Sequence, residues 1–224
     1  EYTGESYRLD VPETIDGVSV RTIGANAFNG NWNLIYLTLP EGLTAIEDGA
    51  FESAYQLSFV EFPSTLRTIG NRAFYNYRGG KLMLPEGLER IGDEAFYRCS
   101  VRGTLELPEG LKEIGDSAFA RSIFMRTLDL PSTLEIIGEH AFEDVSLSYV
   151  YMDGLTPPKV AKTAFAECTS LADIELNEYC TKQQMLDMQA IIDEAGLSCR
   201  VWRYENTQTS MAKGASYIYN PNNS

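Results

Sequence analysis

Hydrophobic residues recur along this chain with a period of about 23 positions. Seven aliphatic residues lie 23, 23, 22, 23, 23 and 23 positions apart, namely Ile23, Ile46, Ile69, Ile91, Ile114, Ile137 and Val160. Five positions after each of them comes a phenylalanine preceded by alanine, namely Phe28, Phe51, Phe74, Phe96, Phe119, Phe142 and Phe165. Self-similarity at a fixed period of this length is the signature of a repeat protein. The pattern therefore predicts a stack of seven similar units.

Each unit also contains a short segment in which apolar and polar positions alternate. The first complete unit places Leu37 and Leu39 on either side of Thr38, and Pro40 follows. The apolar pair recurs as Val60 and Phe62, Leu82 and Leu84, Leu105 and Leu107, Leu128 and Leu130, Val150 and Met152, and Ile174 and Leu176. Alternation with a period of two predicts a short strand with one buried face. Proline ends the strand in five units because it has no N–H to donate.

A unit of this size cannot bury its own apolar edge, so it must stack on its neighbours. The predicted fold is a repeat solenoid, with short parallel strands about 4.8 Å apart in one sheet and short helical or 3-10 turns on the other side. Phenylalanine then lies over phenylalanine in one core. The Asp or Asn that comes two positions after the isoleucine is expected to be the N-cap of a one-turn helix, at Asp48, Asn71, Asp93 and Asp116.

The two ends of the chain depart from the repeat. We expect an N-terminal strand and cap over residues 1–22, the solenoid over 23–176, and a C-terminal cap and tail over 177–224. Thr181 and Gln184 form a capping box for a helix that ends at Gly196. Apolar residues then alternate from Leu197 to Val201, which predicts a closing strand. This strand–helix–strand cap would cover the open end of the core.

The four cysteines show no C-x-x-C spacing, so no zinc site is predicted. Cys99 and Cys168 occupy the same position three units apart, which is about 14 Å and too far for a disulfide, so both are expected to be buried thiols. Cys180 and Cys199 flank the tail helix. They are a candidate disulfide in a secreted protein, with free thiols as the alternative.

Composition excludes several functions. The 18 basic and 32 acidic residues give a net charge of −14, which disfavours nucleic acid and anionic membranes as partners. His140 is the single histidine, and it occupies a position with no pattern among the units, so imidazole catalysis is not expected. No apolar run reaches the roughly 20 residues of a membrane span. The chain begins at Glu1, and we expect any signal or lipid anchor segment to be absent from it.

Two groups of side chains are candidates for binding. Outward positions of the strands provide Tyr36, Phe59, Glu61, Met83, Glu106, Asp129, Tyr149, Tyr151 and Glu175. Aromatic residues soon after the repeat phenylalanine provide a second row, at Trp32, Tyr55 and Tyr77. The adjacent carboxylates of Glu106 and Asp129 are either a solvated acidic face or a site for a basic ligand or calcium. The aromatic row either contacts a ligand or covers the end of the core.

The repeated unit, L-x-x-L-x-L-P-x-x-L-x-x-I-G-x-x-A-F, resembles the BspA-like leucine-rich repeats over about residues 9–176. The resemblance implies a leucine-rich-repeat fold. Members of that family are mostly surface-exposed or secreted bacterial proteins, and some act as adhesins toward host matrix proteins or other cells. The resemblance therefore implies a secreted or surface-displayed protein. From the residues themselves, we expect no catalytic equipment and no cofactor.

Three functions follow from these features. The first is non-enzymatic recognition of a protein or peptide ligand, such as one on a host or another cell, through the exposed side of the strands. The second is glycan binding by the aromatic row. The third is a passive spacer that presents other domains. An enzyme is the least favoured class, because the paired carboxylates alone do not define a cleft for glycoside hydrolysis.

Overall fold

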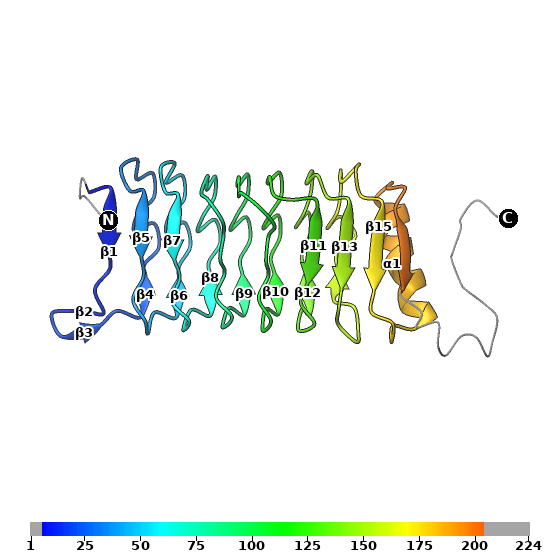
Figure 1. Cartoon of the computed structure of the whole chain (residues 1–224), viewed down its shortest axis with the longest axis horizontal. Helices are drawn as coiled ribbons and strands as arrows, with labels where there is room; N and C mark the ends of the chain where they lie inside the picture. The colour runs from blue at the N-terminus through cyan, green and yellow to red at the C-terminus, as the bar shows by residue number, and fades with distance from the viewer. Residues whose placement is uncertain (1–5, 204–224) are drawn as a thin grey trace.

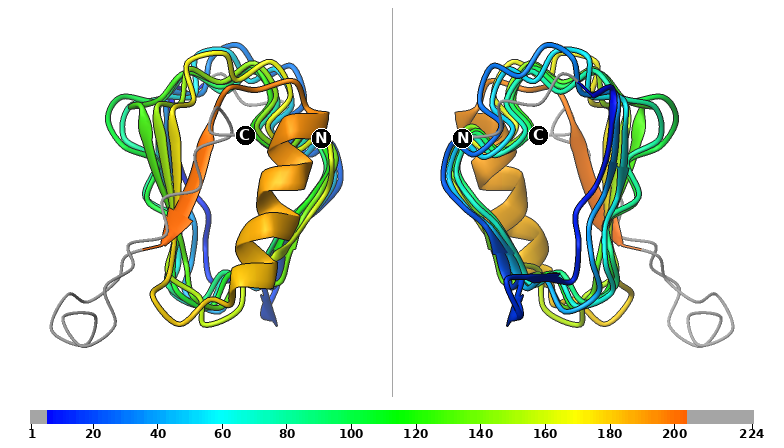
Figure 2. Two further views of the ribbon diagram at one scale, coloured as in Figure 1. Left: turned by 90° about the vertical axis from the view of Figure 1, so that its right-hand side faces the viewer. Right: turned by 90° about the vertical axis from the view of Figure 1, so that its left-hand side faces the viewer.

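The computed structural model describes residues 6–203 as a parallel-strand β-solenoid of about eight turns (Figure 1). The predicted solenoid is confirmed. The helix at the C-terminal end lies across the last coil, and the N-terminal strand lies at the opposite end of the stack (Figures 1 and 2). Among these residues, no helix has both the length and the apolar character needed to cross a membrane.

The predicted strands form two parallel sheets along one side of the solenoid. The first consists of β1 (Arg8–Asp10), β5 (Tyr36–Thr38) and β7 (Phe59–Glu61). The second consists of β11 (Thr127–Leu130), β13 (Tyr149–Met152), β15 (Asp173–Leu176) and β16 (Arg200–Arg203). In the two coils between them only isolated bridges remain, from Met83 to Glu106 and from Glu106 to Asp129. These bridges keep the two middle coils in register with β11, and a hydrogen bond from Gly80 N to Ser58 O at 2.9 Å joins them to the coil of β7.

A second ladder of seven parallel two-residue strands carries the repeated isoleucines. These strands are β4 (Thr22–Ile23), β6 (Ala45–Ile46), β8 (Thr68–Ile69), β9 (Arg90–Ile91), β10 (Glu113–Ile114), β12 (Ile136–Ile137) and β14 (Lys159–Val160). The predicted helical turns are wrong, because α1 (Lys182–Glu194) is the only helix among residues 6–203. The chain instead passes from each two-residue strand into hydrogen-bonded turns around the phenylalanine.

The phenylalanines form one continuous stack through the core. Consecutive ring centroids from Phe28 to Phe165 lie 4.9, 5.2, 5.4, 5.3, 5.6 and 5.6 Å apart, with interplanar angles of 13° or less. Each phenylalanine except Phe28 is almost completely buried. The turn around it contains left-handed residues on both sides; in the unit of Phe96 these are Glu94 with φ 51° and Arg98 with φ 54°. The predicted column of like residues is confirmed.

The acidic residues at the turns join one coil to the next. Oδ1 of Asp48 accepts a hydrogen bond from the backbone N of Asn71 at 2.7 Å. The next three coils repeat this bond. Oδ1 of Asn71 accepts from Asp93 N at 2.8 Å, Oδ1 of Asp93 accepts from Asp116 N at 3.0 Å, and Oδ1 of Asp116 accepts from Glu139 N at 2.7 Å. The predicted N-cap role is therefore wrong, since these side chains satisfy N–H groups of the following coil. Glycine before this position permits the close approach, because a Cβ at Gly70 would lie 2.6 Å from Oδ1 of Asp48.

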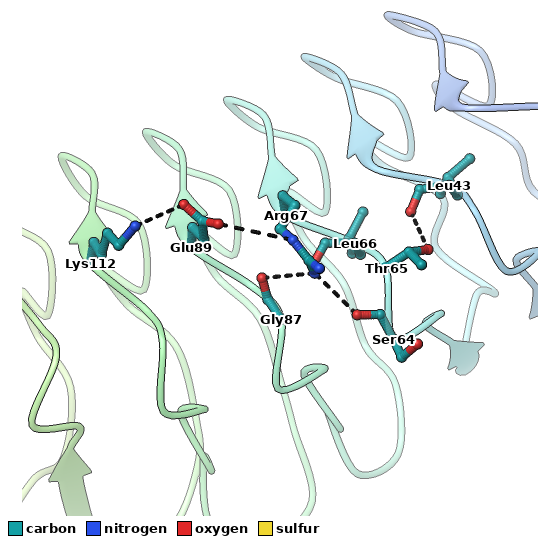
Figure 3. A network of polar contacts seen from close by, with 8 residues as sticks. All are labelled: Leu43, Ser64, Thr65, Leu66, Arg67, Gly87, Glu89 and Lys112. Atoms are coloured by element: carbon teal, nitrogen blue, oxygen red, sulfur yellow. Dashed lines mark hydrogen bonds and ion pairs between the residues drawn. The ribbon is translucent and has the colours of Figure 1, made fainter.

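A second set of contacts joins the corners that follow the strands (Figure 3). Gly42 N donates to Thr65 Oγ1 at 2.9 Å, and that hydroxyl donates to Leu43 O at 2.8 Å. Glu41 accepts from both the backbone N and the hydroxyl of Ser64. Three coils further, Glu109-Gly110 and Ser132-Thr133 repeat the arrangement. A Glu-Gly corner thus pairs with the Ser-Thr corner of the next coil.

Where one Glu-Gly corner follows a Ser-Thr corner, an arginine fills the space instead. The guanidinium of Arg67 donates to the carbonyls of Ser64, Leu66 and Gly87 at 3.1–3.2 Å (Figure 3). A Cβ at Gly87 would lie 1.9 Å from this group. The carboxylate of Glu89 forms ion pairs with Arg67 at 3.9 Å and with Lys112 at 3.0 Å, one on each side.

Short elements close both ends of the core. The antiparallel hairpin β2 (Thr14–Ile15) and β3 (Val18–Ser19) turns through Asp16 and Gly17, both with positive φ. At the other end α1 begins at the predicted capping box of Thr181 and Gln184, and β16 pairs with β15. The predicted helix and closing strand are confirmed, whereas the predicted tail beyond Arg203 lies outside the described residues.

The four cysteines are buried free thiols, so the candidate disulfide between Cys180 and Cys199 is absent from this structure. Cys180 follows the carboxyl end of β15, whereas Cys199 precedes the amino end of β16. Because these two strands are parallel, the thiols lie at opposite ends of the sheet. At about 3.3 Å per residue, four strand residues exceed the roughly 7 Å Cα separation that a disulfide allows. Cys99 and Cys168 are buried as predicted.

Candidate functional site

The outward side chains of the two sheets form two parallel rows, which we call the strand face. Inward residues alternate with them and are buried, which fixes the side chains that point outward. The first row contains Arg8, Tyr36, Phe59, Lys81, Thr104, Thr127, Tyr149, Asp173 and Arg200. The second contains Asp10, Thr38, Glu61, Met83, Glu106, Asp129, Tyr151, Glu175 and Trp202.

The N-terminal half of the strand face carries three exposed apolar side chains among polar and charged ones (Arg8, Asp10, Thr38, Glu61 and Lys81). Tyr36 and Phe59 are paired in register on β5 and β7, and their rings stack with centroids 4.9 Å apart at 7°. Both rings are exposed, and Met83 is exposed further along the second row. Gly80 follows β7 in the stack, and a Cβ there would lie 3.6 Å from the ring of Phe59. We call Tyr36, Phe59 and Met83 the apolar half.

The C-terminal half of the strand face is acidic and rich in hydroxyl groups. Glu106 and Asp129 occupy adjacent rungs, as predicted, and Lys81 pairs with Glu106 at 2.9 Å. Tyr149 donates a hydrogen bond to Glu175, and Tyr151 donates one to Asp153 at 3.0 Å. We call Glu106, Asp129, Tyr149, Tyr151 and Glu175 the polar half.

Partial burial changes the acid–base properties of the polar half. Burial raises the pKa of the Glu175 carboxyl above its usual value. Burial, followed by the hydrogen bond to Asp153, raises the pKa of Tyr151. The Tyr151 hydroxyl therefore stays protonated at neutral pH, and the hydroxyls of Tyr149 and Tyr151 each donate a hydrogen bond to a carboxylate. These groups can donate and accept hydrogen bonds from a ligand.

Sequence analysis missed the rungs at both ends of the strand face. β1 pairs with β5 and adds Arg8 and Asp10, which form an ion pair at 3.2 Å. The signal was present, because Leu9-Asp10-Val11-Pro12 repeats the pattern of Leu37-Thr38-Leu39-Pro40. β16 adds Arg200 and Trp202, and Arg200 pairs with Asp173 at 2.7 Å.

The aromatic row predicted at Trp32, Tyr55 and Tyr77 does not form. Trp32 and Tyr55 are exposed, at 73% and 53%, but no ring contact joins them among the described residues. Tyr77 is only 3% exposed and its hydroxyl donates to Ser58 O at 3.0 Å, so its inclusion in the row is wrong. Tyr77 lies three positions after the phenylalanine, and this position points inward in the neighbouring coils, where it holds Ala54 and Cys99.

Residues 6–203 offer little equipment for catalysis. No group of three or more His, Cys, Asp or Glu residues there is placed to hold a metal ion. The thiols are buried, and burial raises the pKa of Cys168 to about 11 and that of Cys199 to about 12. His140 pairs with Glu143 at 2.6 Å at the turns, away from the strand face. A cleft of about 490 Å³ lies along Thr156-Pro157-Pro158 and Ser132-Thr133, beside the corners.

Comparison with known proteins places this geometry in a family. The family model for the BspA-type leucine-rich repeat region matches six copies, over residues 21–148 and 89–185. No curated protein matches the chain. A leucine-rich cell surface protein from Faecalibacterium prausnitzii A2-165 is similar at 25% identity and a TM-score of 0.62, over 78% of this chain and 48% of that one. A leucine-rich repeat protein from T. pallidum shows 20% identity and a TM-score of 0.49, over 85% of each chain.

The chain spans about half the length of the Faecalibacterium protein. The family match covers most of the chain and agrees with the 23-residue period, the phenylalanine stack and the parallel strands. The chain belongs to the BspA-type leucine-rich repeat family.

Proposed function

We propose that the chain is a non-enzymatic recognition module that binds a protein or peptide through the strand face. The observation that carries this proposal is the exposed stack of Tyr36 and Phe59 on a rigid sheet. Aromatic side chains that are already held in place lose little conformational entropy on binding, so they serve as anchors. The apolar half would supply contact area, and the polar half would supply hydrogen bonds and charge.

The comparisons support a location for this activity. The Faecalibacterium relative is a cell surface protein, and many members of the family are of that kind. We therefore propose that this chain acts outside the cell or at its surface, where the strand face meets a ligand on another cell or on the surrounding matrix.

Selection from a random peptide library tests the strand face directly. Twelve-residue peptides displayed on phage are selected on the wild-type chain, and the strongest binders are measured by fluorescence anisotropy. We expect peptides whose affinity falls about tenfold or more in Phe59→Ser, because an aromatic anchor carries much of the binding energy. Tyr55→Ser is the matched control, since Tyr55 is exposed to 53% and Phe59 to 52%. Peptides that bind Phe59→Ser as well as wild type would contradict the proposal.

Glycan binding is the second candidate, and it rests on Trp32. This side chain is 73% exposed and has no ring partner among the described residues. An exposed indole face can stack on a sugar ring. A glycan array with wild type and Trp32→Ala distinguishes this candidate, because sugar binding that is lost in the variant favours it.

A further inference from the structure

Three neighbouring coils carry a group of positive charges on an otherwise acidic chain. The segments between phenylalanine and strand are 75–82, 97–104 and 120–127. They contain Arg78, Lys81, Arg98, Arg102, Arg121 and Arg126 and no Asp or Glu. The corresponding segments 29–36, 52–59, 143–150 and 166–173 contain no basic residue. Since the chain carries a net charge of −14, this concentration is a local reversal of sign. We call these three segments the arginine ridge.

Most of these arginines have no carboxylate partner. Arg78, Arg98, Arg102 and Arg126 are exposed, and none of them forms an ion pair within residues 6–203. Arg121 pairs with Glu143 at 3.2 Å. Arg72 differs in its ion pairs, because its guanidinium lies between Glu52 and Glu94. Both Arg72 and Arg98 also lie over an aromatic ring, Tyr75 at 4.0 Å and Tyr97 at 5.5 Å.

The backbone holds like charges close together. Arg98 and Arg121 stand on consecutive rungs, both with positive φ, and the backbone N of Arg98 donates to Ala120 O at 2.9 Å. Neighbouring rungs are about 4.8 Å apart, and like charges at this spacing repel. Glu143 offsets the charge of Arg121, and Arg98 lies over the ring of Tyr97. A coil could avoid the repulsion with any neutral residue at this position, as Asn76 does in the coil before.

The segments are also displaced outward. Arg102 N donates to Gly80 O at 3.2 Å and Met125 N donates to Gly103 O at 2.9 Å, so the ridge is hydrogen-bonded across coils. Ser122 anchors it from inside, where its buried hydroxyl donates to Phe96 O at 2.7 Å. In the views along the stack the teal and green loops of the middle coils project beyond the others (Figure 2). The ridge is therefore a supported protrusion.

Two uncovered aliphatic side chains lie among the arginines. Ile123 is 69% exposed and Met125 is 58% exposed. Ile123 bridges Ser100 on the neighbouring coil, and Sδ of Met125 lies 3.5 Å from the hydroxyl of Thr104. Arginine, methionine and aromatic residues are enriched in protein–protein interfaces. A polyanion such as DNA would contact the arginines through its phosphates and would leave the aliphatic groups unpaired. It is also repelled at long range by the negative net charge of the chain.

We propose that the arginine ridge is a second interaction surface, which binds an acidic segment of a partner protein. Carboxylates of that segment pair with the guanidinium groups of Arg98, Arg102 and Arg126, and its aliphatic side chains pack on Ile123 and Met125. A guanidinium group and a carboxylate can form two parallel, charge-assisted hydrogen bonds, which makes the contact directional. The ridge borders the strand face, with which it shares Lys81, Thr104 and Thr127, but its arginines, Ile123 and Met125 are not strand-face residues.

The same phage-displayed library tests the ridge with different variants. We expect a class of selected peptides rich in Asp and Glu around Leu, Ile or Val. Their affinity should fall about tenfold in Arg102→Glu and also fall in Ile123→Ser, with weaker binding at high salt. Lys159→Glu is the matched control, because Lys159 is also exposed and makes no ion pair among residues 6–203. It should leave the affinity unchanged.

Four outcomes would overturn the proposal. One is a selection that yields no acidic peptides, and the second is an acidic class that binds Arg102→Glu as well as wild type. The third is an equal loss of affinity in Lys159→Glu, which would reveal only a net-charge effect. The fourth is binding of heparin that requires Arg102 but not Ile123, which would assign the ridge to a sulfated polysaccharide. Phe59→Ser separates the two proposals, since ridge-binding peptides should bind this variant normally.

Discussion

Individual side chains in this solenoid are defined by their distance from the repeat phenylalanine. Tyr77 shows this clearly: its ring packs edge-on against Phe74 with centroids 5.9 Å apart, in the inward position that Ala54 fills one coil earlier. The larger ring is accommodated because Gly79 leaves space, since a Cβ there would lie 1.9 Å from the phenol. Burial raises the pKa of Tyr77 well above its usual value. The ring therefore contributes to the core and not to the surface.

Glu175 gives the polar half a pH dependence with a definite sign. Burial raises the pKa of its carboxyl in the folded chain, so the folded state favours the protonated form. Its contribution to stability is complete below the unfolded pKa of about 4.3 and is lost as the pH rises through the folded value. We expect Glu175→Gln to raise the urea midpoint at pH 7. The gain over wild type should disappear below about pH 4, where the carboxyl is neutral in both states.

Glu61→Gln is the control for that measurement, because it removes one exposed charge from the same face. A stabilisation of equal size in both variants would show that only the net charge matters. A gain in Glu175→Gln that persists at pH 3 would contradict the role of burial.

At the scale of elements, α1 does more than cover the last coil. Gln189 is a buried polar residue on the helix, and its amide hydrogen-bonds to two backbone groups on one edge of the closing strand. Nε2 donates to Cys199 O at 3.1 Å, and Oε1 accepts from Val201 N at 3.0 Å. These backbone groups lie on the edge of β16 that faces away from β15. An uncovered edge can pair with another chain, so Gln189 ends the sheet.

Replacement of Gln189 by leucine should therefore destabilise the cap. Leucine has a similar size but leaves two buried backbone groups without partners, at a cost of about 1–3 kcal/mol for each unsatisfied group. Hydrogen exchange of the Val201 amide should become faster than in wild type, and urea unfolding should occur at lower concentration. Gln183→Leu is the control, because Gln183 is exposed and bonds only Asp187. Equal protection of Val201 in both variants would contradict the role of Gln189.

The elements that sequence analysis predicted are those with a repeated or capped signal. The strands with Leu37 and Leu39, and the helix that begins at Thr181, follow from alternation and from the capping box. The two-residue strands such as β4 are too short to show a period, so their ladder was missed. The contact of Asp48 with Asn71 joins residues of different coils, and a local capping rule cannot find it. The arginine ridge could not be predicted from local sequence patterns either, because its three segments come together only when the coils stack.

At the scale of the whole molecule, stability depends on contacts between neighbouring coils. The seven rings from Phe28 to Phe165 form a single column, and the coils contact only their neighbours. An interior ring such as Phe96 lies between two other rings of this column, whereas Phe28 is the first of the seven and is slightly exposed. Loss of an interior ring therefore interrupts the column, while loss of the first ring only shortens it.

We expect Phe96→Ala to lower the free energy of unfolding by about 3–5 kcal/mol, the range for a buried phenylalanine. Phe28→Ala should cost less, because Phe28 is slightly exposed and its loss leaves the remaining six rings stacked on one another. Urea unfolding followed by circular dichroism measures both. Equal losses in the two variants would contradict a column whose interior positions carry more of the stability.

The Glu-Gly and Ser-Thr corners described above restrict how such a chain can gain coils by duplication. An insert between the coils of Glu41 and Ser64 would separate these two residues. The backbone amide of Gly42 would then lose its hydrogen bond to Thr65. An insert ahead of the Glu86-Gly87 corner would separate no Glu–Ser pair, and at this corner it would break the side-chain contacts of Arg67 with Gly87 and Glu89. Recombination is thus tolerated at some joints and penalised at others. Some coils therefore require a particular coil as their neighbour, whereas others do not.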